Sequence, residues 1–183
     1  MALELIKKHI KCGLFHEARK LIENVDNIDY LMNDIGSSAS QFILPSSKSV
    51  KNLVLPSSSS MPLTSNSNQQ FYYEKNDENL PLLVMLSLIK DEDSALSLSR
   101  LLLEKGYDLS MCDRNGLCAL NYAIALKRIK LLNLFLSSFN FELDSYYDCF
   151  RNTFLHYVFA TNNKEIIKRF HDTYSKYYEW DTE

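Results

Sequence analysis

The sequence predicts an all-α protein in which helix–turn–helix units stack side by side. Two observations support this class. Apolar residues recur at three- and four-residue steps in residues 1–35 and again from position 80 onward, which is the period of amphipathic helices. In the second region a whole segment recurs after 35 residues, as is typical of repeat proteins. Together with a change of composition in the middle, this organises the chain into three zones: residues 1–35, 36–78 and 79–183.

Residues 1–35 are expected to form a pair of short helices. Ile6, Ile10 and Leu14 lie at four-residue intervals, so they share one helical face. Gly13 lies between the two helical stretches, where a glycine readily ends a helix. We interpret this zone as a degenerate N-terminal repeat, related to the later ones by pattern alone.

Residues 36–78 differ in composition from the rest of the chain. Serine dominates, and three of the four prolines, Pro45, Pro56 and Pro62, lie here. Such residues compete with regular backbone pairing and form little core, so this zone is predicted to be a disordered insertion. The segments ILPSS (43–47) and VLPSS (54–58) repeat one another and leave a second interpretation open, in which they dock on another protein in extended form.

The repeat is clearest between the segments that contain Asp113 and Asp148. Setting Asp113 on Asp148 also sets Leu120 on Leu155, with an offset of 35 residues in both cases. Leu82 is assigned to the same position in the preceding unit, 38 residues before Leu120. Three successive units of similar length therefore follow the serine-rich zone.

These units resemble ankyrin repeats, whose period is about 33 residues and whose hallmark is T-P-L-H-x-A. Residues 153–156 read T-F-L-H, Gly106 and Asp108 match the start of the family pattern, and Gly116 stands at its hairpin turn. Residues 134–136 (L-F-L) take the place of the leucine triplet in the second helix. The resemblance covers the third zone in register and the first zone by pattern only.

The resemblance implies an ankyrin-like helix–turn–helix stack with hairpin loops, a non-catalytic role in binding another protein, and hydrogen bonding between repeats by His156. Independently of the family, Gly116 is expected to adopt a positive φ in a tight turn. Thr153 is expected to cap the helix that follows it. Cys118 stands in the equivalent position and is expected to cap less well, at a cost of about 1 kcal/mol.

Three departures from the family pattern are expected. The triplet Leu101-Leu102-Leu103 falls late, which we attribute to extra residues at 91–94 between the two helices of that unit. Two further extra residues are placed near 139–141. The last hairpin has Arg151 where the turn glycine would stand.

Composition and charge argue against several function classes. The chain has 20 basic and 23 acidic residues, a net charge of −3, whereas nucleic-acid binders usually have a strongly basic face, so no nucleic-acid partner is expected. No apolar run reaches the ~18 residues of a membrane-spanning helix, and residues 1–20 lack the features of a signal peptide. Neither membrane insertion nor secretion is therefore expected. The cysteines are predicted to be reduced thiols of an intracellular protein, cytoplasmic or nuclear.

Three groups of residues offer chemical alternatives. Cys12 and His16 could supply two metal ligands, but no motif supplies the others, so no metal is predicted. Cys112 and Cys118 flank a turn and could approach one another, yet no disulfide is expected in a reducing compartment. His156 could serve as a base, but no nucleophile elbow, phosphate loop or H-E-x-x-H motif accompanies it. The protein is predicted not to be an enzyme, and no cofactor is expected.

The predicted partner-binding surface lies where stacked repeats leave the sequence free to vary, on the hairpin tips and first helices of the third and fourth units. Leu117 and Phe150 are apolar where residues ordinarily face solvent, and arginine, as at Arg114, is common in interfaces. The interpretation left open is that these are scattered surface residues. The predicted surface comprises Cys112, Arg114, Asn115, Leu117, Leu126, Tyr147, Cys149, Phe150, Asn152 and Thr161.

The aromatic C-terminus leaves two interpretations open. Phe170, Tyr174, Tyr177 and Tyr178 share one helical face, and Trp180 follows. This face packs on the preceding repeat and closes the stack, or it is an exposed aromatic anchor for a partner.

The predicted function is non-catalytic binding of another protein, as an adaptor, an inhibitor or a subunit of a larger complex. A second hypothesis makes the serine-rich zone the functional element, with its LPSS segments docking elsewhere under the control of phosphorylation. A hypothesis from another class is a small hydrolase that uses His156.

Overall fold

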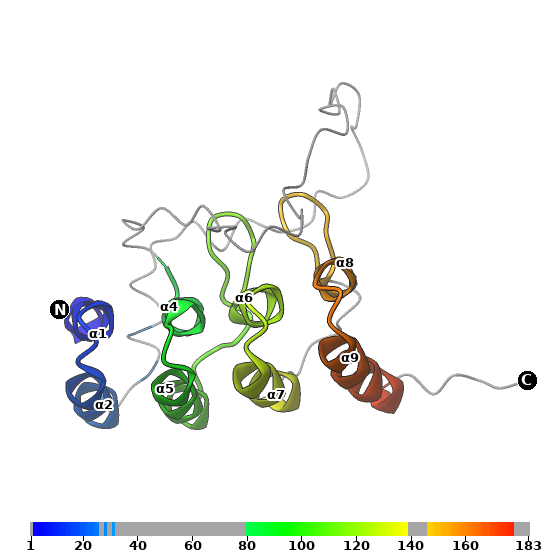
Figure 1. The fold of residues 1–183 in the computed structure, drawn as a ribbon. Coiled ribbons are helices and arrows are strands. Elements are labelled where there is room, and N and C mark those ends of the chain that lie inside the picture. Colours follow the sequence, from blue (N-terminus) through cyan, green and yellow to red (C-terminus); the bar gives the residue numbers. More distant parts are fainter. Residues whose placement is uncertain (1, 26–27, 29–30, 32–79, 139–145, 178–183) are drawn as a thin grey trace, which may run out of the picture.

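The computed structural model describes residues 2–25, 28, 31, 80–138 and 146–177 (Figure 1). Within these residues all regular secondary structure is α-helical, with eight helices and no strand, so the all-α prediction is confirmed for this part of the chain. The helices are α1 (Ala2–Lys11), α2 (Phe15–Glu23), α4 (Leu82–Leu88), α5 (Glu92–Glu104), α6 (Ala119–Ala125), α7 (Ile129–Ser138), α8 (Phe154–Ala160) and α9 (Lys164–Tyr177).

Several predictions fall outside the described residues. These are the serine-rich insertion, the extra residues near 139–141, and the aromatic residues Tyr178 and Trp180. The side chains of Tyr174 and Tyr177 are likewise not described. Of the predicted aromatic face, Phe170 is described, and it is buried in the core.

The helices form two layers (Figure 1). α1, α4, α6 and α8 follow one another in the first layer, and α2, α5, α7 and α9 in the second, so each helix pair stands beside the pair before it. Neighbours within a layer pack directly, α4 on α6 and α6 on α8, as well as α2 on α5 and α5 on α7. The loops that precede α6 and α8 project away from the second layer. α1 and α2 lie at one end of the row, and α8 and α9 lie at the other.

The core runs along the first layer. Residues 82–87 of α4 and 119–124 of α6 are all buried, because each of these helices has a neighbour on both sides and a second-layer helix below it. The second-layer helices are amphipathic and bury one face, as Leu98 and Leu102 of α5 show. Three phenylalanines fill the space between the layers toward the C-terminal end: Phe135, Phe154 and Phe170.

The helix boundaries correct the predicted position of the extra residues. α4 and α5, α6 and α7, and α8 and α9 each begin ten residues apart, so the prediction of an insertion at 91–94 is wrong. The late leucine triplet has another cause. α5 continues to Glu104, and these leucines belong to its last turns, from which Leu102 enters the core.

The same boundaries shift the alignment of the second unit by one residue. α4 begins at Leu82 and α6 at Ala119, 37 residues later. Leu83, and not Leu82, therefore stands in the position of Leu120, and both are buried. The 35-residue offset between the third and fourth units holds, because α6 and α8 begin at Ala119 and Phe154.

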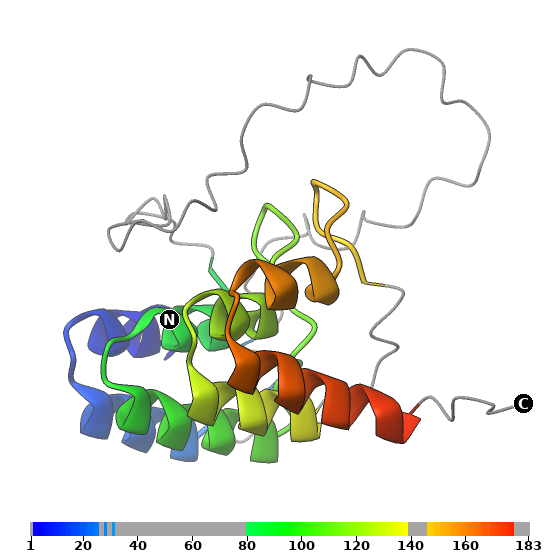
Figure 2. The ribbon, with the colours of Figure 1, turned by 45° about the vertical axis from the view of Figure 1, so that its right-hand side comes forward.

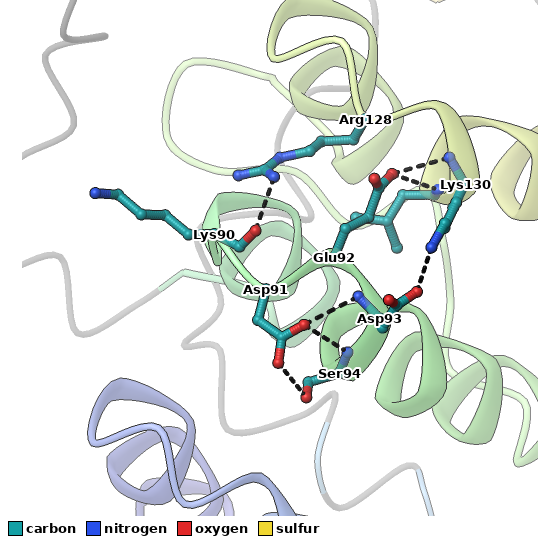
Figure 3. A network of polar contacts seen from close by, with 8 residues as sticks. Lys90, Asp91, Glu92, Asp93, Ser94, Arg128 and Lys130 are labelled. Carbon is teal, nitrogen blue, oxygen red and sulfur yellow. Dashed lines mark hydrogen bonds and ion pairs between the residues drawn. The ribbon is translucent and has the colours of Figure 1, made fainter.

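A polar network joins the second and third units where α5 and α7 begin (Figure 3). Glu92 Oε1 accepts hydrogen bonds from the backbone N–H groups of Lys130 (2.8 Å) and Leu131 (3.4 Å), so a carboxylate of one unit caps the first turn of a helix in the next. Lys130 Nζ also lies 2.5 Å from Asp93 Oδ1. These contacts hold α5 and α7 in register.

The first turn of α5 is itself capped by Asp91. Its carboxylate accepts hydrogen bonds from the hydroxyl of Ser94 (2.6 Å) and from the backbone N–H groups of Ser94 (3.3 Å) and Asp93 (3.2 Å), which lower the pKa of Asp91. Further hydrogen bonds between units join Arg128 to the Lys90 carbonyl, Arg19 to Ser97, and Arg169 to Asn133.

Replacing Glu92 with alanine removes the acceptor that caps α7 and is expected to lower the free energy of unfolding by about 1 kcal/mol. The matched control is Asp93→Ala in the same helical turn, which removes only an exposed ion pair and is expected to cost less than about 0.5 kcal/mol. Urea denaturation followed by circular dichroism measures both. Equal losses for the two variants would contradict the capping role of Glu92.

Candidate functional site

The hairpin before α6 is organised by Asp113. Its Oδ1 accepts hydrogen bonds from the backbone N–H groups of Asn115 and Leu117, both at 2.9 Å. Its Oδ2 accepts a hydrogen bond from the hydroxyl of Tyr122 in α6, at 2.7 Å. The aspartate therefore closes the turn and ties it to the helix that follows.

The hairpin before α8 is built in the same way by Asp148, which is buried. Its Oδ1 accepts from the backbone N–H groups of Phe150 and Asn152, both at 2.8 Å, and its Oδ2 accepts from the hydroxyl of Tyr157 in α8, at 2.5 Å. Burial, together with this bond to a carboxylate, raises the pKa of Tyr157 above its usual value. Sequence reasoning missed these tyrosines, although an aspartate followed by a tyrosine nine residues later occurs in both units.

The turns of the two hairpins share an unusual backbone conformation. Gly116 has φ of 75°, which confirms the predicted positive φ, and Arg151, 35 residues later, has φ of 63°. Both residues donate a backbone hydrogen bond to the carbonyl of the organising aspartate, at 3.0 Å. Arginine thus adopts in the last hairpin the left-handed conformation that glycine adopts in the one before it, at a cost of about 1–2 kcal/mol.

The two hairpins touch each other. The backbone N–H of Cys149 donates to the carbonyl of Asn115 at 3.0 Å. A methyl group added to Gly116 would lie 3.3 Å from the Asp148 Cα and from the Cys149 nitrogen. The tips therefore form one continuous surface.

Tyr146 anchors the last hairpin to the one before it. Its ring stacks on Phe154 with centroids 4.4 Å apart, and its hydroxyl donates to the Gly116 carbonyl and accepts from the Cys118 N–H at 3.1 Å. Cys112 Sγ lies 3.2 Å from the same hydroxyl. Burial raises the pKa of the Tyr146 hydroxyl, so this group stays neutral and can donate.

The two cysteines that flank the hairpin before α6 are free thiols. Cys112 and Cys118 face each other across a single antiparallel backbone bridge, but no disulfide joins them. Burial raises the pKa of Cys112 to about 11 and that of Cys118 to about 12. Both thiols are therefore protonated near neutral pH.

The helix starts place reciprocal capping contacts at both predicted capping residues, Cys118 and Thr153. The backbone N–H of Cys118 donates to Asn121 Oδ1 at 3.0 Å, and that of Thr153 donates to His156 Nδ1 at 3.1 Å. The side chain of the third residue in each helix therefore accepts a hydrogen bond from the backbone N–H of the capping residue. This bond does not depend on the side chain of the capping residue. The described contacts of His156 are with Thr153 of its own unit, whereas the resemblance implied bonds between units.

The predicted surface residues fall into two groups. Eight lie on the hairpins, where Arg114, Asn115, Tyr147, Cys149 and Phe150 are exposed and Cys112, Leu117 and Asn152 are half-buried. The other two, Leu126 and Thr161, are half-buried residues that follow α6 and α8 at their C-terminal ends. A seven-residue helix, about 10 Å long, separates the two groups in each unit.

The candidate metal ligands do not assemble into a site in the described part of the chain. Cys12 and His16 are exposed, and nowhere among the described residues do three histidine, cysteine, aspartate or glutamate side chains come together as metal ligands would. No helix in this part of the chain has the length and apolar character needed to span a membrane.

No protein-family model matches this chain, and the comparisons with curated proteins and with solved structures found no match.

Gly13 and Gly116 have the same backbone conformation, but only Gly116 lies against another hairpin. Comparing their alanine variants therefore distinguishes local backbone strain from contact between the hairpins. Gly13→Ala, at φ of 73° with open space around it, is expected to lower the free energy of unfolding by about 1 kcal/mol. Gly116→Ala adds a tight contact with the backbone of the next hairpin and is expected to lower it by at least about 1 kcal/mol more. Thermal and urea denaturation measure the difference. Equal losses would show that the hairpins do not support one another.

The thiols are expected to differ widely in reactivity, because the thiolate is the nucleophile. At about pH 8, iodoacetamide is expected to modify the exposed Cys12 at least about 100-fold faster than Cys118, whose pKa is raised. Mass spectrometry of peptides from timed reactions measures both rates. In urea the rates should converge, and a ratio unchanged by unfolding would contradict burial as the cause.

Proposed function

We propose that this chain is a non-catalytic binding protein, and that its helix pairs form an ankyrin-like stack whose hairpin tips bind another protein. The observation that carries the proposal is the exposure of large apolar side chains on hairpins whose backbones are held firmly. Phe150 is 70% exposed and Tyr147 is 56% exposed. Aromatic residues and arginine are the types that contribute most to binding energy in interfaces.

The rigidity of the hairpins supports binding at their tips. Asp113 and Asp148 each hold a turn with two backbone hydrogen bonds and tie it to a helix through a tyrosine. Contact between the tips removes further freedom. Because little conformational entropy is then lost on binding, a modest apolar surface can give useful affinity.

The chemistry of the tips indicates the kind of partner. Phe150 and Tyr147 offer an apolar, aromatic surface, and the exposed Arg114 on the neighbouring hairpin adds a positive charge. A complementary partner is a protein surface with an apolar pocket and an acidic group beside it. Leu126 and Thr161 extend the proposed surface along the first helices for a partner that reaches past the tips.

We place this binding in the cytoplasm or nucleus, in line with the reduced thiols that the sequence predicts.

The double variant Arg114→Ala, Phe150→Ala is expected to lose at least about tenfold in affinity for the partner, because both side chains are exposed anchors of the surface. Affinity capture from source cells with the full chain identifies the bound protein, and calorimetry with that purified protein measures the affinity. Circular dichroism establishes that the variant is folded.

A matched control is Leu14→Ala, Lys168→Ala, which removes one exposed apolar and one exposed basic side chain away from the hairpins. Binding is expected to survive in the control and in a chain lacking residues 36–78. If the deletion abolishes binding while the hairpin variant does not, the serine-rich zone is the docking element and the proposal fails.

A further inference from the structure

The hairpin before α6 holds two cysteines directly opposite each other. Figure 2 shows this hairpin projecting from the first layer beside the hairpin before α8. At its base, Cys112 and Cys118 face each other in a single antiparallel bridge. One residue nearer the tip on each limb, the backbone N–H of Asp113 donates to the Leu117 carbonyl at 3.0 Å. Cys112 and Cys118 therefore form a non-hydrogen-bonded pair, the kind that brings side chains closest together.

This pairing fits a disulfide. Residues in a non-hydrogen-bonded pair have Cα atoms about 4.5 Å apart, and disulfides join Cα atoms that are roughly 4.4 to 6.8 Å apart. Cys112 Sγ lies 3.2 Å from the Tyr146 hydroxyl, and the same hydroxyl accepts from the Cys118 N–H at 3.1 Å. Burial raises the pKa of Cys118, and the neighbouring Cys112 adds to the rise, as expected for two thiols that lie close together.

The contacts of this hairpin do not require free thiols. Each S–H donates one weak hydrogen bond, from Cys112 to the Ser110 carbonyl at 3.0 Å and from Cys118 to Asn121 Oδ1 at 3.2 Å. The backbone N–H of Cys118 donates to Asn121 Oδ1 and to the Tyr146 hydroxyl, and these bonds involve no thiol. A bond between the two sulfurs thus removes two weak hydrogen bonds and leaves the backbone pairing intact.

We propose that Cys112 and Cys118 are an oxidation site, which closes reversibly into a disulfide when the chain meets a disulfide oxidant such as glutathione disulfide. Cys112 is half-buried and Cys118 is buried, so the Cys112 sulfur reacts first. It loses its proton and attacks one sulfur of the oxidant, and one glutathione leaves as a thiol. The Cys118 sulfur then loses its proton, attacks Cys112 Sγ and releases the second glutathione. The two electrons and two protons that the chain loses are carried by the two glutathione thiols.

The cross-link closes residues 112–118 into a ring at the base of the hairpin. A disulfide stabilises a fold mainly because it restricts the unfolded chain. The other two cysteines are far from each other, since Cys12 follows α1 at one end of the row and Cys149 lies in the hairpin before α8 at the other. The site follows from the geometry of one hairpin and is independent of the binding function proposed above.

Peptide mapping of the full chain tests the pairing, after incubation for hours with glutathione disulfide and then with iodoacetamide. Trypsin cleaves after lysine and arginine, so the four cysteines fall on separate peptides: 12–19, 106–114, 115–127 and 131–151. Mass spectrometry is expected to find 106–114 joined to 115–127 in most chains, and dithiothreitol is expected to separate them. Peptide 106–114 joined to glutathione or to 131–151 instead would overturn the proposal. A link between 106–114 and 115–127 that forms only in urea would overturn it too.

Thermal denaturation of the oxidised and reduced chains tests the effect of the ring. Oxidation is expected to raise the melting temperature by at least about 3 °C. Cys112→Ala is expected to abolish this rise, whereas the matched control Cys149→Ala, which removes an exposed thiol of the neighbouring hairpin, is expected to keep it. Circular dichroism of the reduced proteins establishes that both variants are folded. The absence of a rise in the wild type, or an equal rise in Cys112→Ala, would contradict a stabilising disulfide at this site.

Discussion

The structure depends on one constraint: a pair of short helices cannot bury its apolar residues alone. α6 has seven residues, and six of them are buried because α4, α8 and the second layer surround it. No helix of this length would be stable in water by itself. Each unit of the stack is thus stabilised by its neighbours, and the burial of any position depends on whether a neighbour is present.

Two sets of polar contacts convert this apolar stacking into a defined register. On one side, the hairpins are held by Asp113 and Asp148 and joined through Tyr146 and the backbone of Cys149. On the other side, Glu92 caps the helix of the next unit (Figure 3). Apolar contact is not directional, whereas these hydrogen bonds are, so they determine how one helix pair is positioned on the next.

The function we propose follows from the same arrangement. Turns fixed by several hydrogen bonds to one aspartate can present aromatic side chains to solvent without collapsing onto the core, and Phe150 and Tyr147 are presented in this way. The raised pKa values of Cys112 and Cys118 reflect structural burial, and these thiols support the hairpins as neutral groups. The polar groups described at the hairpins thus serve to hold a surface in shape.

The sequence by itself determined the helices, the 35-residue offset of the last two units and the positive φ of Gly116, because these depend on local periodicity and backbone sterics. The sequence wrongly predicted an insertion at 91–94. An added turn of helix and an insertion in a loop both move the leucine triplet later in the unit, so the sequence pattern could not distinguish them. It also assigned Leu155 to the same motif position as Leu120 without revealing that their environments differ. Only the tertiary structure decided that Leu120 is buried and Leu155 exposed, because burial is conferred by the neighbouring helix and not by the residue.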